Sequence, residues 1–439
     1  MIKPSSPTPD HLRELKFSCL DQFIGPFHYT NLIFFYQADA AAADDDENGY
    51  KSQALKQSLS EILTVFYPLA GQVVLEGNSS INCNDNGVAF VEAKVLDGRQ
   101  LSDMIEEPNL EELKHFLPTQ HFVVEDNIVL LLQVSFFDCG GIAVGFSFLH
   151  KVGDGKSMGE FMTAWANANK YKCNKCKCRC DDQFMNNFNL ASLFPPVEFL
   201  RTTSLPSTTN LSEKFVTKRL ILDRKKLTDL KEAIVSAPGS QLKDPTRVEA
   251  ASAFIWKHYI IDSAAQKRRQ IKLQPNVDQV EVVVENAFMA QHTVDARTRM
   301  NPPETNVFGN CFLIAATEIV NYNDQQQEMH HLAYLLRKAI KKIDGDYIKQ
   351  VQIEGERYFT NLFQRLDPVL KGKLGLCSFS SWCRLPFYEV DYGWGKPLWV
   401  CTTPIPLKNL VVFISTPSGD GIEAWINMLE DDMKIIRIE

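Results

Sequence analysis

Two apolar runs separated by a four-residue turn place the strongest constraint on how this chain can fold. Residues 128–137 (IVLLLQVSFF) and 142–149 (IAVGFSFL) each have the length and composition of a buried β-strand. The turn between them ends in Gly140 and Gly141, which can adopt the positive φ angles that a tight hairpin requires. The pair therefore predicts a buried β-hairpin.

Helical and strand patterns alternate through both halves of the chain, which predicts a layered α/β or α+β fold. Apolar residues recur at helical spacing in three segments: Leu55 to Phe66 just before Pro68, Met158 to Trp165, and Met329 to Ile343. The second half adds further predicted elements, namely strands at 214–222 and 279–287, a helix at 246–260 and a polar loop at 263–278.

The stretch from 171 to 213 interrupts this alternation. It is rich in Cys, Asn, Ser, Thr and Pro and holds no apolar period, so we interpret it as a long crossover between two halves. A chain of 439 residues is long enough for two domains. The predicted organisation is an N-terminal domain at 1–195, a linker at 196–213 and a C-terminal domain at 214–439.

The composition argues against several classes of protein. Charged residues make up 23% and apolar residues 45%, which excludes a wholly disordered or collagen-like chain. The net charge of −8 and the lack of a basic stripe give no support to nucleic acid or an anionic membrane as a partner. The longest apolar stretch is too short to span a bilayer, and the first ten residues (MIKPSSPTPD) lack the apolar core of a secretory signal. We therefore predict a cytoplasmic location.

The cysteine distribution is typical of a reducing compartment. Seven of the eleven cysteines are scattered singly, and their odd total offers no closed disulfide framework. The other four, Cys173, Cys176, Cys178 and Cys180, fall within eight residues. Structural zinc sites normally draw ligands from two separated pairs, and no second pair follows, so we predict no metal site. The alternative, a zinc-dependent module, predicts stoichiometric metal and unfolding by a chelator.

A histidine follows the predicted hairpin directly, in the segment 150–155 (HKVGDG). A ring at the exit of a buried strand, followed by glycines, can be held rigidly while facing a cavity. Neutral imidazole, with a pKa of about 6.5, is well suited to take a proton from a hydroxyl. The pattern therefore makes His150 a candidate general base. The same spacing recurs at His258 and Asp262, inside a continuous helical run where such neighbours arise from composition alone.

Structural interpretations exist for each of these residues. His150 could be a buried histidine with satisfied hydrogen bonds. Asp154 stands just before the helix of Met158 to Trp165, where an aspartate caps free backbone N–H groups. The segment 391–397 (DYGWGKP) holds no nucleophile or phosphate-binding pattern, and its glycines on either side of Trp394 are typical of a closely packed structural loop.

Together, His150-x-x-x-Asp154-Gly155 and Asp391-Tyr392-Gly393-Trp394-Gly395 resemble the paired signature of the plant BAHD acyltransferases, which use coenzyme A thioesters. Further matches run along nearly the whole chain, at 67–71 (YPLAG), 294–299 (VDARTR), 302–303 (PP), 309–310 (GN) and 381–384 (SWCR). The resemblance places the last of these in the strand before the second motif. One departure is Tyr392, where the family usually has Phe; its hydroxyl needs a partner if buried.

The resemblance implies a fold and a set of roles. It implies two similar-sized domains, each a mixed β-sheet with flanking helices, with an active-site channel at the domain interface. His150 would be the base, Asp154 would orient by pairing with Arg297, and Gly155 would lie at the substrate site. Either Ser380 or Trp382 would donate to the oxyanion. The structural residues would be Asp391, Gly393, Trp394 and Gly395.

The implied function is acyl-CoA-dependent O-acyl transfer by His general-base catalysis through a ternary complex. Segment 381–397 most resembles alkaloid O-acetyltransferases of the vinorine synthase-like group, which favours acetyl-CoA as co-substrate and an alkaloid alcohol as acceptor. No permanently bound cofactor and a monomeric state are expected. The alternatives are N-acylation, transfer of a larger or aromatic acyl group, and a non-catalytic relative that binds a small molecule.

Overall fold

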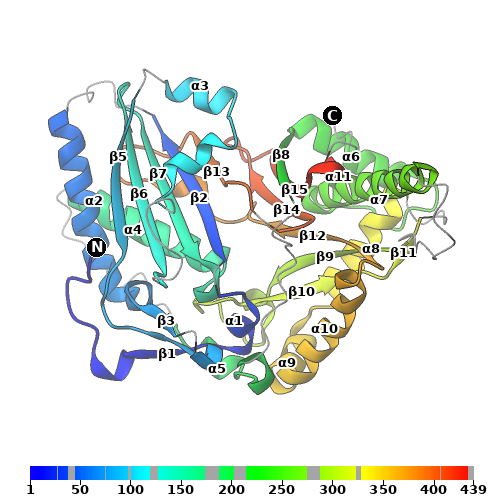
Figure 1. Cartoon of the computed structure of the whole chain (residues 1–439), viewed down its shortest axis with the longest axis horizontal. Helices are drawn as coiled ribbons and strands as arrows, with labels where there is room; N and C mark the ends of the chain where they lie inside the picture. Colours follow the sequence, from blue (N-terminus) through cyan, green and yellow to red (C-terminus); the bar gives the residue numbers. More distant parts are fainter. Residues whose placement is uncertain are drawn as a thin grey trace. The chain divides into compact units, whose positions relative to one another are not determined.

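A computed structural model describes most of the chain, namely residues 1–26, 28–37, 45–74, 76–96, 100–118, 127–173, 187–201, 214–273, 287–322, 328–405 and 407–433. The chain divides into two units (Figure 1). The first unit contains residues 1–205, 303–311 and 385–403, and the second contains residues 206–302, 312–384 and 404–439.

The first unit is built around a five-stranded sheet in the order β13-β2-β7-β6-β5. Its strands are β13 (Trp399–Cys401), β2 (Tyr29–Tyr36), β7 (Ile142–Leu149), β6 (Leu130–Phe137) and β5 (Ala89–Val95). The predicted hairpin is confirmed, because β6 and β7 are antiparallel neighbours with Phe136 opposite Ile142. Only the β5–β6 pair is parallel among these strands. Every residue of β7 is buried.

Two long helices, α2 (Asp45–Val65) and α4 (Gly155–Cys173), pack together in the first unit. The Trp165 ring of α4 lies edge-on to Phe146 of β7, 5.9 Å between centroids, and its indole N–H donates to the Leu55 carbonyl of α2 at 3.1 Å. Smaller elements complete the unit: β1 (Glu14–Lys16), α1 (Cys19–Phe23), β3 (Gln72–Val74), β4 (Ser80–Asn82), α3 (Leu101–Glu106) and α5 (Leu190–Leu193). Residues Tyr67–Ala70 form a 3-10 turn between α2 and β3.

The second unit holds a larger mixed sheet, in the order β10-β9-β12-β14-β15-β8 with β11 beside β9. Its strands are β8 (Phe215–Leu222), β9 (Ala287–Asp295), β10 (Phe312–Ala316), β11 (Val320–Asn321), β12 (Gly375–Ser381), β14 (Leu410–Ser415) and β15 (Ile422–Leu429). Its helices are α6 (Arg224–Ser236), α7 (Arg247–Leu273), α8 (Met329–Lys341), α9 (Gly345–Ile353), α10 (Gly355–Leu370) and α11 (Glu430–Met433).

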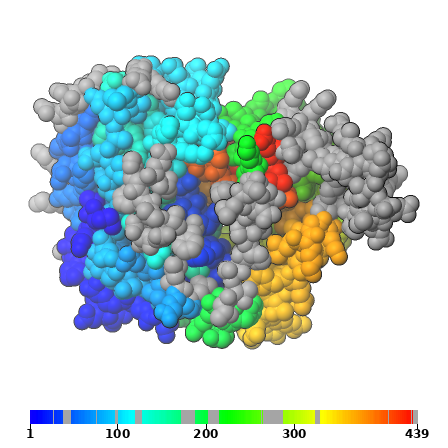
Figure 2. Space-filling view, in the orientation of Figure 1, coloured from blue at the N-terminus to red at the C-terminus, as the bar shows by residue number. Residues whose placement is uncertain are grey.

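The core of the second unit lies between this sheet and helices α7 and α8. Trp256 of α7, Leu332 of α8 and the strand residues Phe379 and Phe413 are all buried in it. By contrast, α10 lies at the surface (yellow-orange in Figure 2), and only Phe359 and Leu362 of this helix are buried. The two units therefore each have the mixed sheet and flanking helices that the resemblance implies, while the channel implied by the resemblance stays a prediction.

Several predicted elements differ from the observed ones. Helix α7 does not end at 260 but continues to Leu273, so the first part of the predicted polar loop is helical. Its residues are mostly Ala, Gln, Lys and Arg, which favour helix regardless of burial. The strand predicted at 279–287 falls mainly outside the described residues, and β9 is described from Ala287 onward. The strand before the second motif ends at Ser381, so Trp382 follows it.

Two segments of the second half belong to the first unit, whereas the predicted boundaries place them in the C-terminal domain at 214–439. Residues 303–311 and 385–403 join it, and β13 extends its sheet by pairing with β2, Trp399 opposite Phe35. Trp399 also stacks on Phe35, with ring centroids 5.5 Å apart. Such long-range pairings leave no local pattern from which a boundary could be drawn.

Among the described helices, none is both long and apolar enough to cross a membrane. The described cysteines outside the 173–180 cluster are free thiols.

The buried His292 predicts an acid-dependent loss of stability. Burial lowers its pKa to about 4, and its ring stacks on Phe379 while Nε2 meets the Ser252 hydroxyl at 2.9 Å. As pH falls from 6.5 toward 4, the unfolded chain binds a proton that the folded chain does not, so stability declines. Between pH 7.5 and 5.0, His292→Gln should remove about 2 kcal/mol of that decline in urea unfolding. An unchanged pH dependence, as expected for exposed His11→Gln, would contradict this.

Candidate active site

His150 stands where β7 ends. It opens a short 3-10 turn, His150–Val152, and its backbone N–H donates to the His28 carbonyl at 2.8 Å, one step beyond the β2–β7 ladder. The side chain is half-buried. The sheet therefore fixes the backbone that carries the ring, as predicted from the hairpin.

The His150 ring is held by Asn310. Its Nδ1 lies 3.0 Å from Asn310 Oδ1. The other end of the amide, Nδ2, donates to the His150 carbonyl at 2.9 Å and the Lys151 carbonyl at 3.2 Å. With the amide oxygen facing Nδ1, we expect the neutral ring to carry its proton on Nδ1 and its lone pair on Nε2. This is the tautomer that a base using Nε2 requires.

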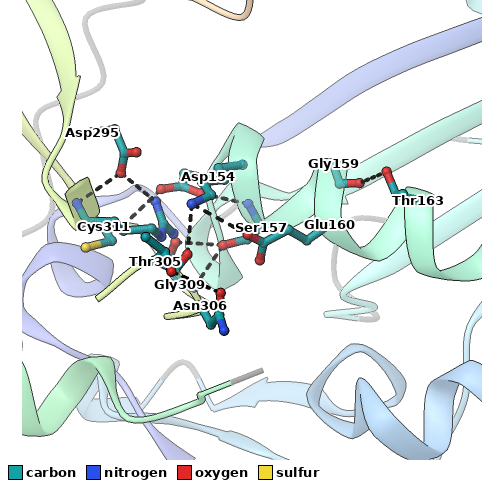
Figure 3. A network of polar contacts seen from close by, with 12 residues as sticks. Asp154, Ser157, Gly159, Glu160, Thr163, Asp295, Thr305, Asn306, Gly309 and Cys311 are labelled. Atoms are coloured by element: carbon teal, nitrogen blue, oxygen red, sulfur yellow. Dashed lines mark hydrogen bonds and ion pairs between the residues drawn. The ribbon is translucent and has the colours of Figure 1, made fainter. Parts of the chain in front are cut away.

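Asp154 holds two backbone N–H groups from opposite directions (Figure 3). Its Oδ1 accepts from Ser157 at 3.0 Å, which caps the start of α4 as the sequence predicts. Its Oδ2 accepts from the backbone N–H of Cys311 at 3.1 Å, a contact that the sequence does not reveal. The carboxylate is buried, so each bond replaces one that water would otherwise make.

The backbone N–H groups of residues 309–311 each donate to a side-chain oxygen. The Gly309 N–H donates to the Ser157 hydroxyl at 3.0 Å, Asn310 donates to Asp21 Oδ1 at 2.9 Å, and Cys311 donates to Asp154. We call residues 309–311 the clamped segment. Gly309 has φ +132°, and a Cβ there would lie 2.6 Å from the Leu190 side chain, so no other residue fits without strain.

The electrostatic surroundings of the ring are set by buried groups. Burial, and secondarily the charge of His150, lowers the pKa of His28 to about 4; the two ring centroids are 5.7 Å apart. Burial lowers the pKa of Lys151 to about 8, against the opposing charge of Asp21, and its ammonium donates to the Ile24 carbonyl at 2.7 Å. Burial raises the pKa of Asp21, although hydrogen bonds from Ser18 and Asn310 oppose the rise. His28 is therefore neutral at physiological pH.

The second motif forms a loop in the same unit. Asp391 Oδ1 accepts from the N–H groups of Gly393 at 2.8 Å and Gly395 at 2.9 Å, and Oδ2 pairs with Lys170 of α4. Burial alone would raise the pKa of Asp391, but Lys170 and the two N–H donors lower it. The Asn169 amide donates to the Tyr392 carbonyl at 2.7 Å. The contacts described for this loop are thus structural ones.

Comparison with known proteins decides the family. A family model described as "Transferase family" matches residues 1–439. Stemmadenine O-acetyltransferase of Catharanthus roseus is 35% identical, over 99% of this chain and 94% of that protein. Vinorine synthase of Rauvolfia serpentina is 36% identical, over 100% and 95%. The chain belongs to the BAHD family of acyltransferases. The crystal structure of vinorine synthase covers 100% of this chain and 95% of its own, with a TM-score of 0.78 at 34% identity.

A more distant structure shares the fold of this acyltransferase. F. sporotrichioides TRI101, complexed with coenzyme A and T-2, aligns with a TM-score of 0.68 at 17% identity over 97% of both chains. The predicted fold class, family and enzyme class are therefore confirmed, and acyl-CoA is the co-substrate that the BAHD family uses.

Three of the remaining predicted site residues, Arg297, Ser380 and Trp382, belong to the second unit. Arg297 is buried and its guanidinium lies 3.0 Å from Asp295 Oδ1. Ser380 is in β12, 3.4 Å from the Thr293 hydroxyl, and the Trp382 backbone N–H donates to the Phe413 carbonyl at 2.8 Å. Their predicted roles, including the pairing of Arg297 with Asp154 and oxyanion donation, stay predictions. Gly155 begins α4, and its predicted substrate contact also stays a prediction.

The second histidine spacing is helical, as predicted. His258 lies within α7, where its Nδ1 meets the Phe254 carbonyl at 2.8 Å and its ring packs on Phe254. Cys176, Cys178 and Cys180 lie outside the described residues, as does the Cys173 side chain. Among the described residues, no cluster of three or more His, Cys, Asp or Glu is placed to hold a metal.

Replacing Asp154 by Ala should damage this acyltransferase in two ways. The change uncaps α4 and leaves the buried Cys311 N–H unpaired, so the free energy of unfolding should fall by about 2–4 kcal/mol. Activity should fall about 10- to 100-fold because the clamped segment also positions His150. Asp223→Ala removes only the cap of α6 and is the matched control. Full activity in folded Asp154→Ala would contradict the positioning role.

The departure at Tyr392 predicts a stabilising substitution. Its hydroxyl is buried without a hydrogen-bond partner among the described residues, at a cost of about 1–3 kcal/mol. Tyr392→Phe should therefore be neutral or raise the free energy of unfolding. Tyr36→Phe is the control, because the Tyr36 hydroxyl donates to the Val390 carbonyl at 3.0 Å and its loss should destabilise by about 1 kcal/mol. Urea unfolding checks both, and a clear loss of stability in Tyr392→Phe would show that the hydroxyl has a partner.

Proposed function

We propose that this enzyme transfers an acetyl group from acetyl-CoA to a hydroxyl group of a plant specialised metabolite, with an alkaloid alcohol as the favoured acceptor. The single observation that supports the chemistry is the contact between His150 Nδ1 and Asn310 Oδ1, which leaves Nε2 as the basic nitrogen. The names of two relatives, stemmadenine O-acetyltransferase and vinorine synthase, support the choice of donor and acceptor class.

The reaction needs one proton to be moved twice. His150 Nε2 takes the proton of the acceptor hydroxyl as its oxygen attacks the thioester carbonyl, giving a tetrahedral intermediate. When the intermediate collapses, the carbon–sulfur bond breaks, and the imidazolium returns the proton to the departing thiolate. The products are the acetyl ester and coenzyme A. A thioester is already activated, so positioning both substrates and one base suffices and no covalent enzyme intermediate is required.

The tetrahedral oxyanion needs a donor, and the Ser380 hydroxyl or the Trp382 indole N–H is the proposed one. Both candidates lie in or just after β12, a strand held between β9 and β14 in parallel pairing. Arg297 is proposed to orient the site by pairing with Asp154. We also propose that the enzyme is a monomer located in the cytosol; the free described thiols support the location.

Replacing His150 by Ala tests the proposed base. Release of thiol from acetyl-CoA with a panel of alkaloid alcohols should fall by about 10²–10⁴-fold, the contribution of a general base. The affinity for acetyl-CoA, measured by calorimetry, should remain nearly unchanged. His258→Ala is the matched control, since that ring makes a helix-internal contact, and it should retain activity.

The outcome is read from two measurements together. Mass detection of products heavier by one acetyl group identifies the acceptor, and amines in the same panel test for N-acylation. Retained turnover in folded His150→Ala, or no transfer to any alcohol by the unmodified enzyme, would overturn the proposed function.

A further inference from the structure

Asp21 is a buried carboxylate that does more than cap a helix. It lies in α1, where its Oδ2 accepts from the Ser18 backbone N–H at 3.0 Å and the Ser18 hydroxyl at 2.6 Å. These contacts complete a capping box at the start of this five-residue helix. Its other oxygen, Oδ1, takes no part in the box. It accepts both the backbone N–H and the side-chain Nδ2 of Asn310, each at 2.9 Å.

The contact with Oδ1 fixes which way the Asn310 amide points. Asn310 is fully buried, and its Nδ2 lies within hydrogen-bond distance of three oxygens: Asp21 Oδ1, the His150 carbonyl and the Lys151 carbonyl. A rotated amide would place its own oxygen against these three acceptors. Of the three, the carboxylate is the strongest acceptor, because its hydrogen bonds are charge-assisted. The amide oxygen is thereby directed at His150 Nδ1.

We propose that Asp21 is a positioning residue for the His150 base: through Asn310 it selects the ring tautomer with the proton on Nδ1 and the lone pair on Nε2. This inference rests on the proposed function, in which Nε2 takes the acceptor proton. Asp21 itself touches no reacting atom in this scheme. It acts through two hydrogen bonds in series, from Asp21 to Asn310 and from Asn310 to the ring.

The neighbouring groups hold Asp21 in place for this role. Lys151 is buried, and its ammonium donates to the Asp21 carbonyl at 3.2 Å and the Ile24 carbonyl at 2.7 Å while lying over the Phe17 ring. The cation thus binds the end of α1 to the turn that carries His150. The backbone of Asp21 is therefore held by Lys151, while its Oδ1 accepts both hydrogen bonds from Asn310.

The direct test reads the tautomer in the unmodified enzyme. Nitrogen-15 spectra of histidine-labelled protein distinguish protonated from unprotonated ring nitrogens, and the His150 signals are assigned by their loss in His150→Ala. We expect Nδ1 to be protonated and Nε2 unprotonated in the neutral ring. A ring protonated on Nε2 would overturn the proposal, whether or not any Asp21 variant folds.

Two substitutions at the start of α1 distinguish a role in positioning His150 from a role in stability alone. Asp21→Ala removes both sets of contacts, whereas Ser18→Ala weakens the same capping box but leaves Oδ1 on Asn310. Asp21→Ala should lower kcat about 10- to 100-fold with little change in the KM for acetyl-CoA, since part of the 10²–10⁴-fold contribution of the base is lost. Its His150 signals should show a mixture of tautomers. Ser18→Ala should also lose stability, though less than Asp21→Ala, while kcat changes less than about twofold and the tautomer is kept.

Asp21→Asn serves as the rescue variant. Its amide oxygen can still accept from Asn310, so kcat should be clearly higher than in Asp21→Ala, and His150 should again carry its proton on Nδ1. Equal kcat in Asp21→Ala and Ser18→Ala, or an unchanged tautomer in Asp21→Ala, would overturn the positioning role. Such a result together with an inactive His150→Ala would leave the proposed function standing, whereas an active His150→Ala would remove both.

Discussion

The site depends on three consecutive backbone N–H groups, those of the clamped segment 309–311. Each donates a hydrogen bond to a side chain of the first unit: Gly309 to Ser157, Asn310 to Asp21 and Cys311 to Asp154. Leaving any one of them unpaired in the buried interior would cost about 1–3 kcal/mol, so the three bonds together specify one position for the segment. The segment in turn carries Asn310, whose amide meets the His150 ring. The orientation of the ring is thus set by buried backbone groups.

The two carboxylates of the clamp each serve a helix as well. Asp21 belongs to the capping box of α1 and Asp154 caps α4, and in both residues one oxygen faces the helix while the other faces the clamped segment. A carboxylate with two acceptor oxygens can join a helix start to a distant segment without an additional residue. Because each bond is buried and charge-assisted, the helix starts and the clamped segment are held as one body.

The sequence could predict contacts between residues close in the chain but not contacts between distant ones. The hairpin, the candidate base at its exit and the cap of α4 follow from local patterns, because each depends on residues close in the chain. The contact of Asp21 with Asn310 joins residues 289 positions apart, and β13 pairs with a strand from the opposite end of the chain. The resemblance points to Gly309 and Asn310 but gives them no role, since the partner of a buried amide is visible only once the chain has folded. The early end predicted for α7 has a different cause: polar residues there suggested a loop although they favour helix.

Helix α4 connects the two signature motifs. Its start is capped by Asp154, and near its other end Asn169 and Lys170 hold the loop of Tyr392 and Asp391. Trp165, between them, packs its ring edge-on against Tyr392 at 4.9 Å and against Phe146 of the strand that leads to His150. A loop that fixes this helix also fixes where its start lies, and with it the carboxylate that receives Cys311. The second motif can therefore influence catalysis without contacting a substrate. It fixes the position of α4, and the start of α4 is where Asp154 of the first motif binds.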